Sequence, residues 1–269
     1  MPSTTPGRSK TAYPRSFVEN ATGGLLIVMA HPDDESMGCG GLILRHTRAG
    51  IPVHLICATY GEAGWTGKPI GARREDLAEI RAAELEEAAG ALGLGGVELW
   101  DYPDGGLAAS NQQEITRRIW EEIIRRRPLA VAGWGPDGIY GHPDHVAIGA
   151  CTDAAVAAMT EGERPALYHL AVDAPLKEFY DVALRLGGGD QTLPLVVQDH
   201  VDVVIGLSAD EVMMKLRAID CHKSQLEDWR IAIREEPVLL EKGYGREPYV
   251  TVSSRAPGLT AKGLLGEFG

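Results

Sequence analysis

The sequence has few cysteines, no excess of positive charge and no long hydrophobic run, and each lack narrows the class of protein. Its four cysteines, at positions 39, 57, 151 and 221, form no C-x-x-C pair, so we interpret them as reduced core thiols of a reducing compartment. Lys and Arg number 26 against 38 Asp and Glu, a formal net charge of −12, which opposes binding to nucleic acid or to an anionic membrane. The apolar run at residues 25–30 is far shorter than the roughly 20 residues that span a bilayer.

Composition and length predict a globular protein with one large core. The chain has 269 residues, of which 44% are hydrophobic and 24% charged, a balance typical of folded domains. Residues 1–22 are polar and contain no apolar stretch of signal-peptide length. We therefore expect a polar N-terminal extension over residues 1–22, a single domain over residues 23–269, and a cytoplasmic location.

Apolar runs that alternate with helical patterns predict an α/β fold. Residues 25–30 form a continuous apolar stretch, the pattern of a strand buried on both faces. We expect a Rossmann-like, doubly wound and mainly parallel sheet, with helices on both faces and a less regular C-terminal third. The expected strands are 25–30, 53–58, 97–100, 129–133, 166–172, 201–205 and 249–253; the expected helices are 40–50, 73–94, 114–127, 146–159 and 209–222.

Two polar clusters follow strands of this sheet and share a His-Pro-Asp kernel. The sequence His-Pro-Asp-Asp-Glu occupies residues 31–35, and Tyr-Gly-His-Pro-Asp-His occupies residues 140–145. Each cluster taken alone is also typical of a helix start, with proline at the first position and acids in the first turn. That interpretation leaves the histidines unexplained. Because active crevices of such sheets lie at the carboxyl ends of strands, we expect the two clusters to meet there.

A zinc site is the chemistry that these residue types suit best. Catalytic zinc takes three protein ligands and leaves a position for water, and His31, Asp34 and His145 would supply them. The same two-histidine, one-carboxylate set suits Fe(II) oxygenases, but the buried parallel sheet matches their usual scaffold poorly, and the remaining acids and bases fit hydrolysis better.

Other motifs in the chain do not favour a nucleotide site or a serine nucleophile. Residues 133–138 formally satisfy G-x-G-x-x-G, yet Pro136 stands where a phosphate-binding loop needs a backbone N–H, and the motif follows the fourth strand rather than the first. Neither the G-x-x-x-x-G-K-[ST] loop nor the G-x-S-x-G elbow is present.

These motifs resemble those of the PIG-L/LmbE-like N-acetylglucosaminyl deacetylases, whose hallmarks are A-H-P-D-D-E after the first strand and G-H-P-D-H further on. Residues 30–35 and 141–145 match both. The similarity continues through residues 59–64 (TYGEAG), 81–84 (RAAE), 102–105 (YPDG) and 222–225 (HKSQ), so it covers about residues 24–225. The paired His-Pro-Asp motifs in this order are its most specific part.

The resemblance implies a zinc-dependent hydrolase with defined residue roles. His31, Asp34 and His145 match the family's zinc ligands, and Asp33 matches its general base. Zinc lowers the pKa of bound water to about 7, so a neighbouring carboxylate can accept its proton and later protonate the leaving amine.

Further catalytic roles fall on the second cluster. We expect His142 to donate to the oxyanion of the tetrahedral intermediate. Asp144 would orient that imidazole and favour its protonated form. Tyr140 resembles a mobile tyrosine that some family members use near the same oxygen, although an ordinary loop aromatic explains it equally well.

Three residues are candidates for sugar binding. Arg81 resembles the family's sugar-contacting arginine. Alternatively, it forms an ion pair with Glu84, which lies three residues further on the same face of the helix. Asp104 would accept sugar hydroxyls, and Trp65 would stack on a sugar ring unless it is a half-buried loop residue. His222 matches a family position whose role the sequence does not reveal.

Together these features predict a Zn²⁺-dependent deacetylase of an N-acetylglucosamine-type sugar or its conjugate, acting on a small molecule. An amidase that cleaves a larger acyl group is the nearest alternative, and a non-catalytic sugar-binding module is the other. The resemblance further implies a homo-oligomer, a trimer or hexamer.

Overall fold

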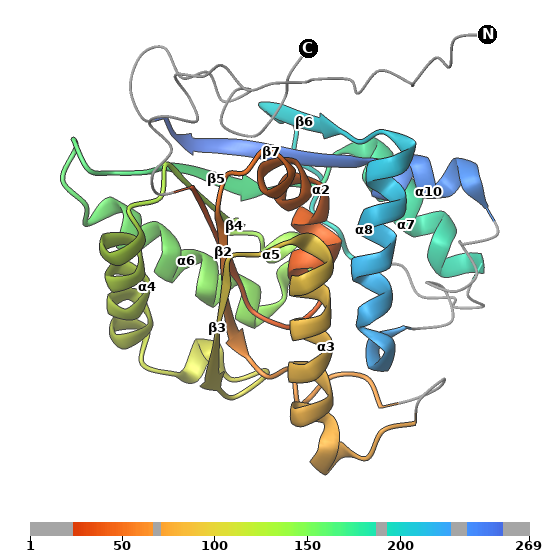
Figure 1. Cartoon of the computed structure of the whole chain (residues 1–269), viewed down its shortest axis with the longest axis horizontal. Helices are drawn as coiled ribbons and strands as arrows, with labels where there is room; N and C mark the ends of the chain where they lie inside the picture. Colours follow the sequence, from red (N-terminus) through yellow and green to blue (C-terminus); the bar gives the residue numbers. More distant parts are fainter. Residues whose placement is uncertain (1–23, 67–70, 187–192, 227–235, 255–269) are drawn as a thin grey trace, which may run out of the picture.

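The computed structural model describes residues 24–66, 71–186, 193–226 and 236–254. Its seven strands form one sheet in the order β3-β2-β1-β4-β5-β7-β6, with helices on both faces (Figure 1). The first five strands pair in parallel, whereas β7 runs antiparallel to both β5 and β6. The predicted α/β class with a mainly parallel sheet is confirmed, and the expected extension at residues 1–22 lies outside the described part.

The strands are β1 (Leu25–Met29), β2 (Val53–Thr59), β3 (Gly96–Tyr102), β4 (Ala130–Trp134), β5 (Ala166–Leu170), β6 (Val203–Gly206) and β7 (Arg246–Ser253). The helices are α2 (Asp34–Arg48), α3 (Leu77–Leu92), α4 (Gln112–Arg126), α5 (Gly138–Gly141), α6 (Pro143–Ala157), α7 (Ala174–Leu186), α8 (Ala209–Cys221) and α10 (Pro237–Tyr244). Three single 3₁₀ turns complete them, at Arg74–Asp76, Leu107–Ala109 and Lys223–Gln225.

Strand β1 lies at the centre of the sheet because its residues are apolar on both faces. Residues 25–29 are each at most 1% exposed, as expected for a strand covered by helices on both sides. Its neighbours are β2 on one side and β4 on the other, so the chain order reverses between β1 and β4. Such a switch point opens a crevice at the carboxyl ends of the strands, and both His-Pro-Asp motifs follow these two strands.

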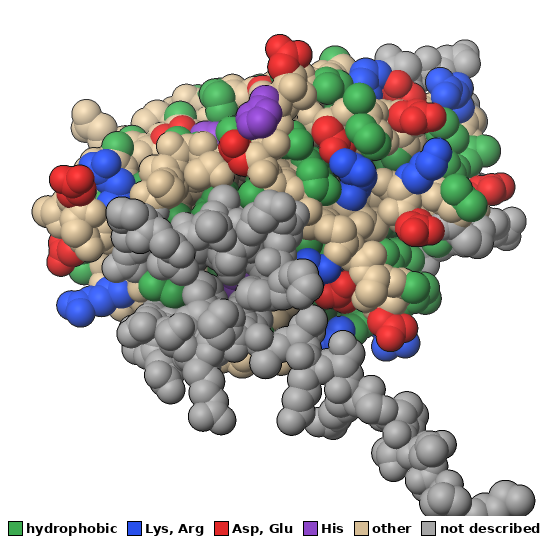
Figure 2. Space-filling view, turned by 90° about the horizontal axis from the view of Figure 1, so that it is seen from above, with side chains coloured by type: hydrophobic (Ala, Val, Ile, Leu, Met, Phe, Trp, Pro, Cys, Tyr) green, Lys and Arg blue, Asp and Glu red, His purple; other side chains and the backbone are tan. Residues whose placement is uncertain are grey.

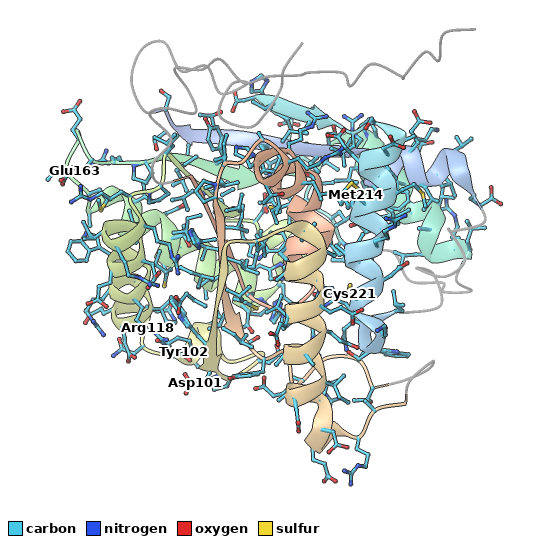
Figure 3. All side chains as sticks on the ribbon, in the orientation of Figure 1. Asp101, Tyr102, Arg118, Glu163, Met214 and Cys221 are labelled. Atoms are coloured by element: carbon cyan, nitrogen blue, oxygen red, sulfur yellow. The ribbon has the colours of Figure 1, made fainter. Side chains whose placement is uncertain are left out.

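Each face of the sheet is covered by a separate group of helices. Helices α2, α3 and α8 pack together on one face, and α4 packs with α6 on the other (Figure 1). Helix α4 buries Ile115, Ile119 and Ile123, a spacing of four that keeps them on one side. At the sheet edge, the guanidinium of Arg118 lies over the rings of Trp100 and Tyr102 at 4.1 and 5.3 Å (Figure 3).

Several predicted element bounds were wrong. The helix expected at residues 40–50 begins at Asp34, within the first motif. The helix expected at 73–94 starts with a 3₁₀ turn and ends where Gly93 adopts a φ of +73°, a conformation that glycine adopts without strain. Helices α7 and α10 were not predicted, although Phe179 of α7 and Tyr244 of α10 pack together in a second apolar cluster.

A buried ion pair ties the antiparallel strand to the helices. The ammonium of Lys215 on α8 lies 2.6 Å from the carboxylate of Glu247 on β7, and both side chains are 2% exposed. Glu247 also accepts hydrogen bonds from the backbone amides of Gly41 and Leu42 at 2.7 and 2.9 Å. The carboxylate therefore links α8, β7 and the middle of α2, which carries the first motif.

The surface offers no sign of a basic face in the view shown. Acidic and basic side chains are interspersed over the part of that face that is not drawn in grey (Figure 2). Within residues 24–66, 71–186, 193–226 and 236–254, no helix is long and apolar enough to cross a membrane.

Candidate functional site

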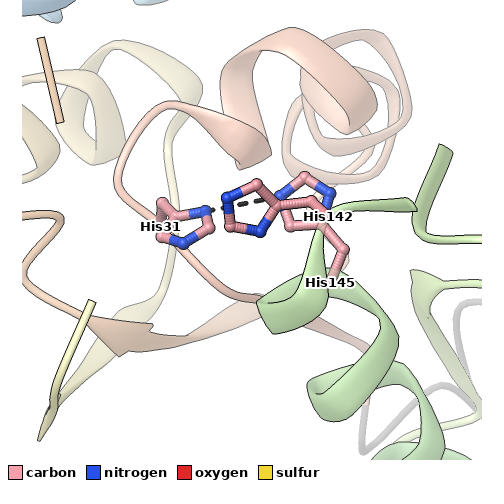
Figure 4. A group of neighbouring side chains, drawn as sticks. All are labelled: His31, His142 and His145. Atoms are coloured by element: carbon pink, nitrogen blue, oxygen red, sulfur yellow. Dashed lines mark hydrogen bonds between the residues drawn. The ribbon is translucent and has the colours of Figure 1, made fainter. Parts of the chain in front are cut away.

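A cavity of about 450 Å³ lies at the carboxyl ends of β1 and β4. Its wall includes His31, Asp33 and Asp34 from the first motif and His142 and His145 from the second. The rings of the three histidines stand next to one another (Figure 4), with centroid separations of 4.7–5.2 Å. The fold thus brings together two motifs that are more than 100 residues apart in the sequence.

Ligand atoms of His31, Asp34 and His145 converge with the spacing of a metal site. His31 Nδ1 lies 3.3 Å from His145 Nε2, and the two nitrogens lie 3.6 Å from different carboxylate oxygens of Asp34, Oδ2 for His31 and Oδ1 for His145. Zinc bonds of 2.0–2.1 Å in tetrahedral geometry separate two ligand atoms by about 3.3–3.5 Å. The donor types and their separations therefore fit zinc.

Hydrogen bonds on the far side of each imidazole leave the converging nitrogens free to bind a cation. His31 Nε2 lies 3.1 Å from Asp104 and 3.2 Å from Asp144, and His145 Nδ1 lies 3.3 Å from the carbonyl oxygen of Gly138. Acceptors at these positions fix the N–H there and leave the lone pairs on His31 Nδ1 and His145 Nε2. Histidines that bind metals show this pattern.

The charges of two of the three residues favour a bound cation, whereas hydrogen bonds to carboxylates raise the pKa of the third, His31, well above its ordinary value against the effect of burial. Burial lowers the pKa of His145 to about 4. The charge of Asp34 opposes this shift, and His31 and His142 add to it, so His145 is neutral near pH 7. Burial alone raises the pKa of Asp34, but His145 and His31 hold it well below its usual range. Asp34 is further fixed by the amides of Ala30 and His31, at 3.1 and 2.9 Å.

Asp33 lines the same cavity from a strained backbone position. Its φ is +108°, which is uncommon for a residue other than glycine and often marks a functional site. One carboxylate oxygen lies 3.4 Å from the guanidinium of Arg81, and its amide donates to Glu35 at 3.0 Å. The strain and the location agree with the proposed role as a base.

The structure changes the expected relation between His142 and Asp144. His142 Nδ1 accepts from the backbone amide of Asp144 at 3.3 Å and caps α6, so the neutral ring carries its proton on Nε2. The Asp144 carboxylate instead accepts from Gly105 and Leu107 at 2.7 and 3.0 Å and approaches His31. Burial and His31 lower the pKa of His142 despite nearby carboxylates. Asp144 therefore contacts this ring through its backbone amide, and its carboxylate favours the protonated form without offsetting burial and His31.

Tyr140 stands beside the cluster, as the resemblance implied. Its ring meets those of His142 and His145 edge-on, at centroid distances of 5.7 and 5.5 Å, and it lines the cavity. Helix α5, which carries it, is broken, with non-helical dihedral angles at Ile139 and Tyr140. This irregular turn directs the tyrosine toward the histidines.

Of the three predicted sugar-binding residues, only Arg81 and Asp104 line the cavity. Arg81 is 3% exposed and donates to the carbonyl oxygens of Gly61 and Pro32, so its alternative pairing with Glu84 was wrong. Its Nε is buried and has no acceptor among the described residues. Asp104 accepts from His31 and from the amide of Ala63 at 2.8 Å.

Trp65 does not line this cavity. Its side chain is 45% exposed, and its backbone is held by both ends of the Gln225 amide at 3.1 Å. The expected stacking platform is therefore on the outer surface, next to Gly64 at the cavity wall.

His222 has a partner that sequence reasoning missed. Its Nε2 lies 2.8 Å from a carboxylate oxygen of Glu35, and both side chains are completely buried. The neighbouring Ser224 donates to Glu84 through its hydroxyl and its amide, at 2.6 and 2.7 Å. No spacing in the sequence connects these positions, because the contacts join α2 and α3 to the end of α8.

The two sides of the cavity differ in character. Toward β2 and β3 the wall is polar, with Arg81, Asp104 and the backbone of Ala63 and Gly64. Toward β5, α7 and α10 the wall is mainly apolar: Leu170, Val172, Leu176, Tyr180, Leu184 and Tyr244. The histidine cluster lies between these two sides in the order of the strands.

Comparison with known proteins identifies relatives of this chain. The PIG-L family model, described as GlcNAc-PI de-N-acetylase, matches residues 26–156. The 1D-myo-inositol 2-acetamido-2-deoxy-alpha-D-glucopyranoside deacetylase of Actinosynnema mirum is 32% identical, over 91% of this chain and 97% of the relative.

Solved structures share the fold at low sequence identity. The N,N'-diacetylchitobiose deacetylase of Pyrococcus horikoshii matches with a TM-score of 0.61 and 22% identity, over 90% of this chain and 88% of that one. GalB, the 4-carboxy-2-hydroxymuconate hydratase of Pseudomonas putida, matches with a TM-score of 0.60 and 21% identity, over 88% and 99%. Since the second is a hydratase, the fold alone does not decide the reaction.

The resemblance that the paired motifs indicated is thereby confirmed over most of the chain. The family match includes both His-Pro-Asp motifs, and the Actinosynnema mirum relative aligns along nearly its whole length. The chain belongs to the PIG-L (LmbE-like) family of deacetylases.

Proposed function

We propose that this protein is a metal-dependent N-deacetylase that removes the acetyl group from an N-acetylglucosamine-type sugar or its conjugate. The observation that carries the proposal is the convergence of His31, Asp34 and His145, whose nearest ligand atoms are 3.3–3.6 Å apart pair by pair, in one cavity with Asp33 and His142. Relatives that are named as deacetylases of N-acetylglucosaminyl compounds support the choice of substrate.

His31, Asp34 and His145 would hold the metal, and zinc is the ion that their donor types favour. When bound, zinc supplies a Lewis acid that polarises the amide carbonyl and makes a water molecule acidic near neutral pH. The outer contacts of Asp104 and Asp144 to His31 keep that imidazole in the ligating tautomer.

Asp33 would act as general base and then as general acid. Its carboxylate takes a proton from the attacking water, and the same proton then passes to the leaving amine as the C–N bond breaks. Arg81, 3.4 Å from this carboxylate, holds it on the cavity wall. The strained backbone at Asp33 aims the side chain in the free protein.

His142 would stabilise the negative oxygen that develops on the amide carbonyl. With Nδ1 occupied by the amide of Asp144, the neutral ring donates through Nε2–H, and such donors are each worth about 10²–10³ in rate. Tyr140 would add a second donor at the same oxygen. Arg81 and Asp104, which line the cavity, would contact the sugar.

The test is release of primary amine from N-acetylglucosamine, N,N'-diacetylchitobiose and an N-acetylglucosaminyl inositol, before and after removal of metal by a chelator. We expect turnover that chelation abolishes and zinc restores, with about one zinc per chain. Absence of bound metal after reconstitution would contradict the assignment of His31, Asp34 and His145.

Asp33→Asn separates the enzyme from a sugar-binding module. Asparagine tolerates a positive φ as aspartate does, so the variant keeps its fold and metal. Loss of a general base predicts a fall in kcat of about 10²–10⁴. A module that only binds sugar would show affinity and no turnover in either form.

A second candidate function is an amidase that cleaves an acyl group larger than acetyl, and the apolar side of the cavity favours it. A substrate with its sugar on the polar side places the acyl group toward Leu170, Leu176 and Tyr180. Glucosamine substrates with N-acetyl, N-butyryl and N-hexanoyl groups decide between the two. A kcat/KM that rises with chain length would favour the amidase, and a preference for acetyl would favour the deacetylase.

A further inference from the structure

The first motif contains a buried carboxylate that the proposed reaction does not use. Glu35 is 0% exposed and does not line the cavity, yet both of its oxygens have partners. One accepts from the amide of Asp33 at 3.0 Å. The other accepts from Ser36 Oγ at 2.5 Å and lies 2.8 Å from His222 Nε2.

These contacts reach the one residue of the motif whose backbone is strained. Asp33 has a φ of +108° and a ψ of −25° at the start of α2, with no side-chain cap on that helix. A residue in this region returns to an ordinary conformation unless its surroundings hold it there. The amide hydrogen bond from Asp33 to Glu35 is such a restraint, and it lasts only while the Glu35 carboxylate keeps its place.

His222 holds that carboxylate from the other end of the chain. It follows α8, which packs on both α2 and α3, and its side chain is completely buried. It therefore cannot touch a substrate. It lies between α8 and the start of α2, where its hydrogen bond to Glu35 connects it to the amide of Asp33.

We propose that His222 and Glu35 are positioning residues that hold Asp33 in its strained conformation and aim its carboxylate into the cavity. The inference rests on the proposed function, in which Asp33 is the base. It assigns a role to His222, the motif residue that the reaction itself leaves unexplained.

The test compares His222→Leu, which removes the donor to Glu35, with His222→Gln, whose side-chain amide restores an N–H at similar reach. We expect His222→Leu to lower kcat by about 10²-fold, the typical effect of a misplacement near 1 Å, with KM and zinc content unchanged. His222→Gln should recover most of that loss.

His46→Leu is the matched control for the loss of a buried histidine. His46 lies on the same helix α2 and is 2% exposed, and its Nδ1 lies 2.9 Å from the carbonyl oxygen of Leu42 within that helix. We expect this variant to lose thermal stability while kcat stays at the wild-type value. Equal kcat losses in His46→Leu and His222→Leu would overturn the positioning role in favour of a general structural one.

Crystal structures of wild type and Glu35→Gln provide a readout that does not depend on turnover. Glutamine keeps the size of Glu35 but has one acceptor oxygen for two sets of donors, so we expect Asp33 to leave its positive φ and its carboxylate to turn. An unchanged Asp33 backbone in this variant would overturn the inference. Inactive wild-type protein would instead refute the proposed function, and the two structures would still decide the positioning role.

Discussion

Asp104→Ala should weaken zinc binding without removing a zinc ligand. The Asp104 carboxylate accepts from His31 Nε2 at 3.1 Å and from the amide of Ala63 at 2.8 Å. It therefore fixes both the tautomer and the tilt of a ligating ring. Loss of such an outer partner typically costs 10–100-fold in metal affinity.

The structure places the expected effect at the lower end of that range. Asp144 remains 3.2 Å from the same nitrogen of His31, so one acceptor survives the substitution. We expect the zinc Kd to rise about tenfold, or about 1.4 kcal/mol. Asp104→Asn should lie between wild type and Asp104→Ala, because its amide keeps an acceptor for His31 but turns an NH₂ group toward the Ala63 amide.

Competition against a chelating zinc indicator measures the three affinities on one scale. Asp101→Ala is the control, because Asp101 is an exposed acid on β3, three residues before Asp104, and its loss should leave the zinc Kd unchanged. Wild-type affinity in Asp104→Ala would refute the outer-contact argument. Complete loss of zinc would refute it in the other direction, by making Asp104 a direct ligand.

Three further results follow from buried contacts elsewhere. Lys215→Met should lower the free energy of unfolding by about 3–5 kcal/mol, because it leaves Glu247 buried without its counter-charge; a loss below 1 kcal/mol in urea unfolding would contradict this. Gly149→Ala should destabilise the protein and lower its Tm in calorimetry, since the added Cβ would lie 2.5 Å from the carbonyl oxygen of Trp134; an unchanged Tm would show that α6 shifts freely. Burial raises the pKa of Glu35, but His222 and the hydrogen bonds to the carboxylate lower this pKa below the ordinary 4.5. The ionised carboxylate therefore stabilises the folded protein above pH 4.5, and this contribution is lost as the pH falls through the folded-state pKa. The difference in unfolding free energy between wild type and Glu35→Gln should narrow below pH 4.5, and a widening difference would contradict this.

The fold class was predictable because burial on both faces leaves a direct mark on composition. The run at β1 is apolar at every position, and its alternation with helical patterns indicated a parallel sheet before any contact was known. The C-terminal part was harder. Strand β7 inserts antiparallel between β5 and β6, and nothing in its local pattern states which strands it pairs with.

The sequence led to the proposed metal-ligand set for a different reason. The residue types that bind zinc are few, and two clusters at strand ends of one sheet leave little choice about where they meet. The roles of the neighbouring acids were not predictable in this way. Asp104 and Asp144 both turn toward His31 rather than toward a sugar or His142, which depends on distances that spacing in the chain does not encode.

By itself the sequence determined the class of fold, the family and the two motifs, since these depend on local apolar pattern and on residue types in short runs. Only the tertiary structure decided which groups share a hydrogen bond. The path from His222 through Glu35 to the amide of Asp33 joins positions 187 residues apart, and it exists because α8 packs against α2. Long-range packing of this kind sets the direction of a side chain, and direction is what the chemistry of the site requires.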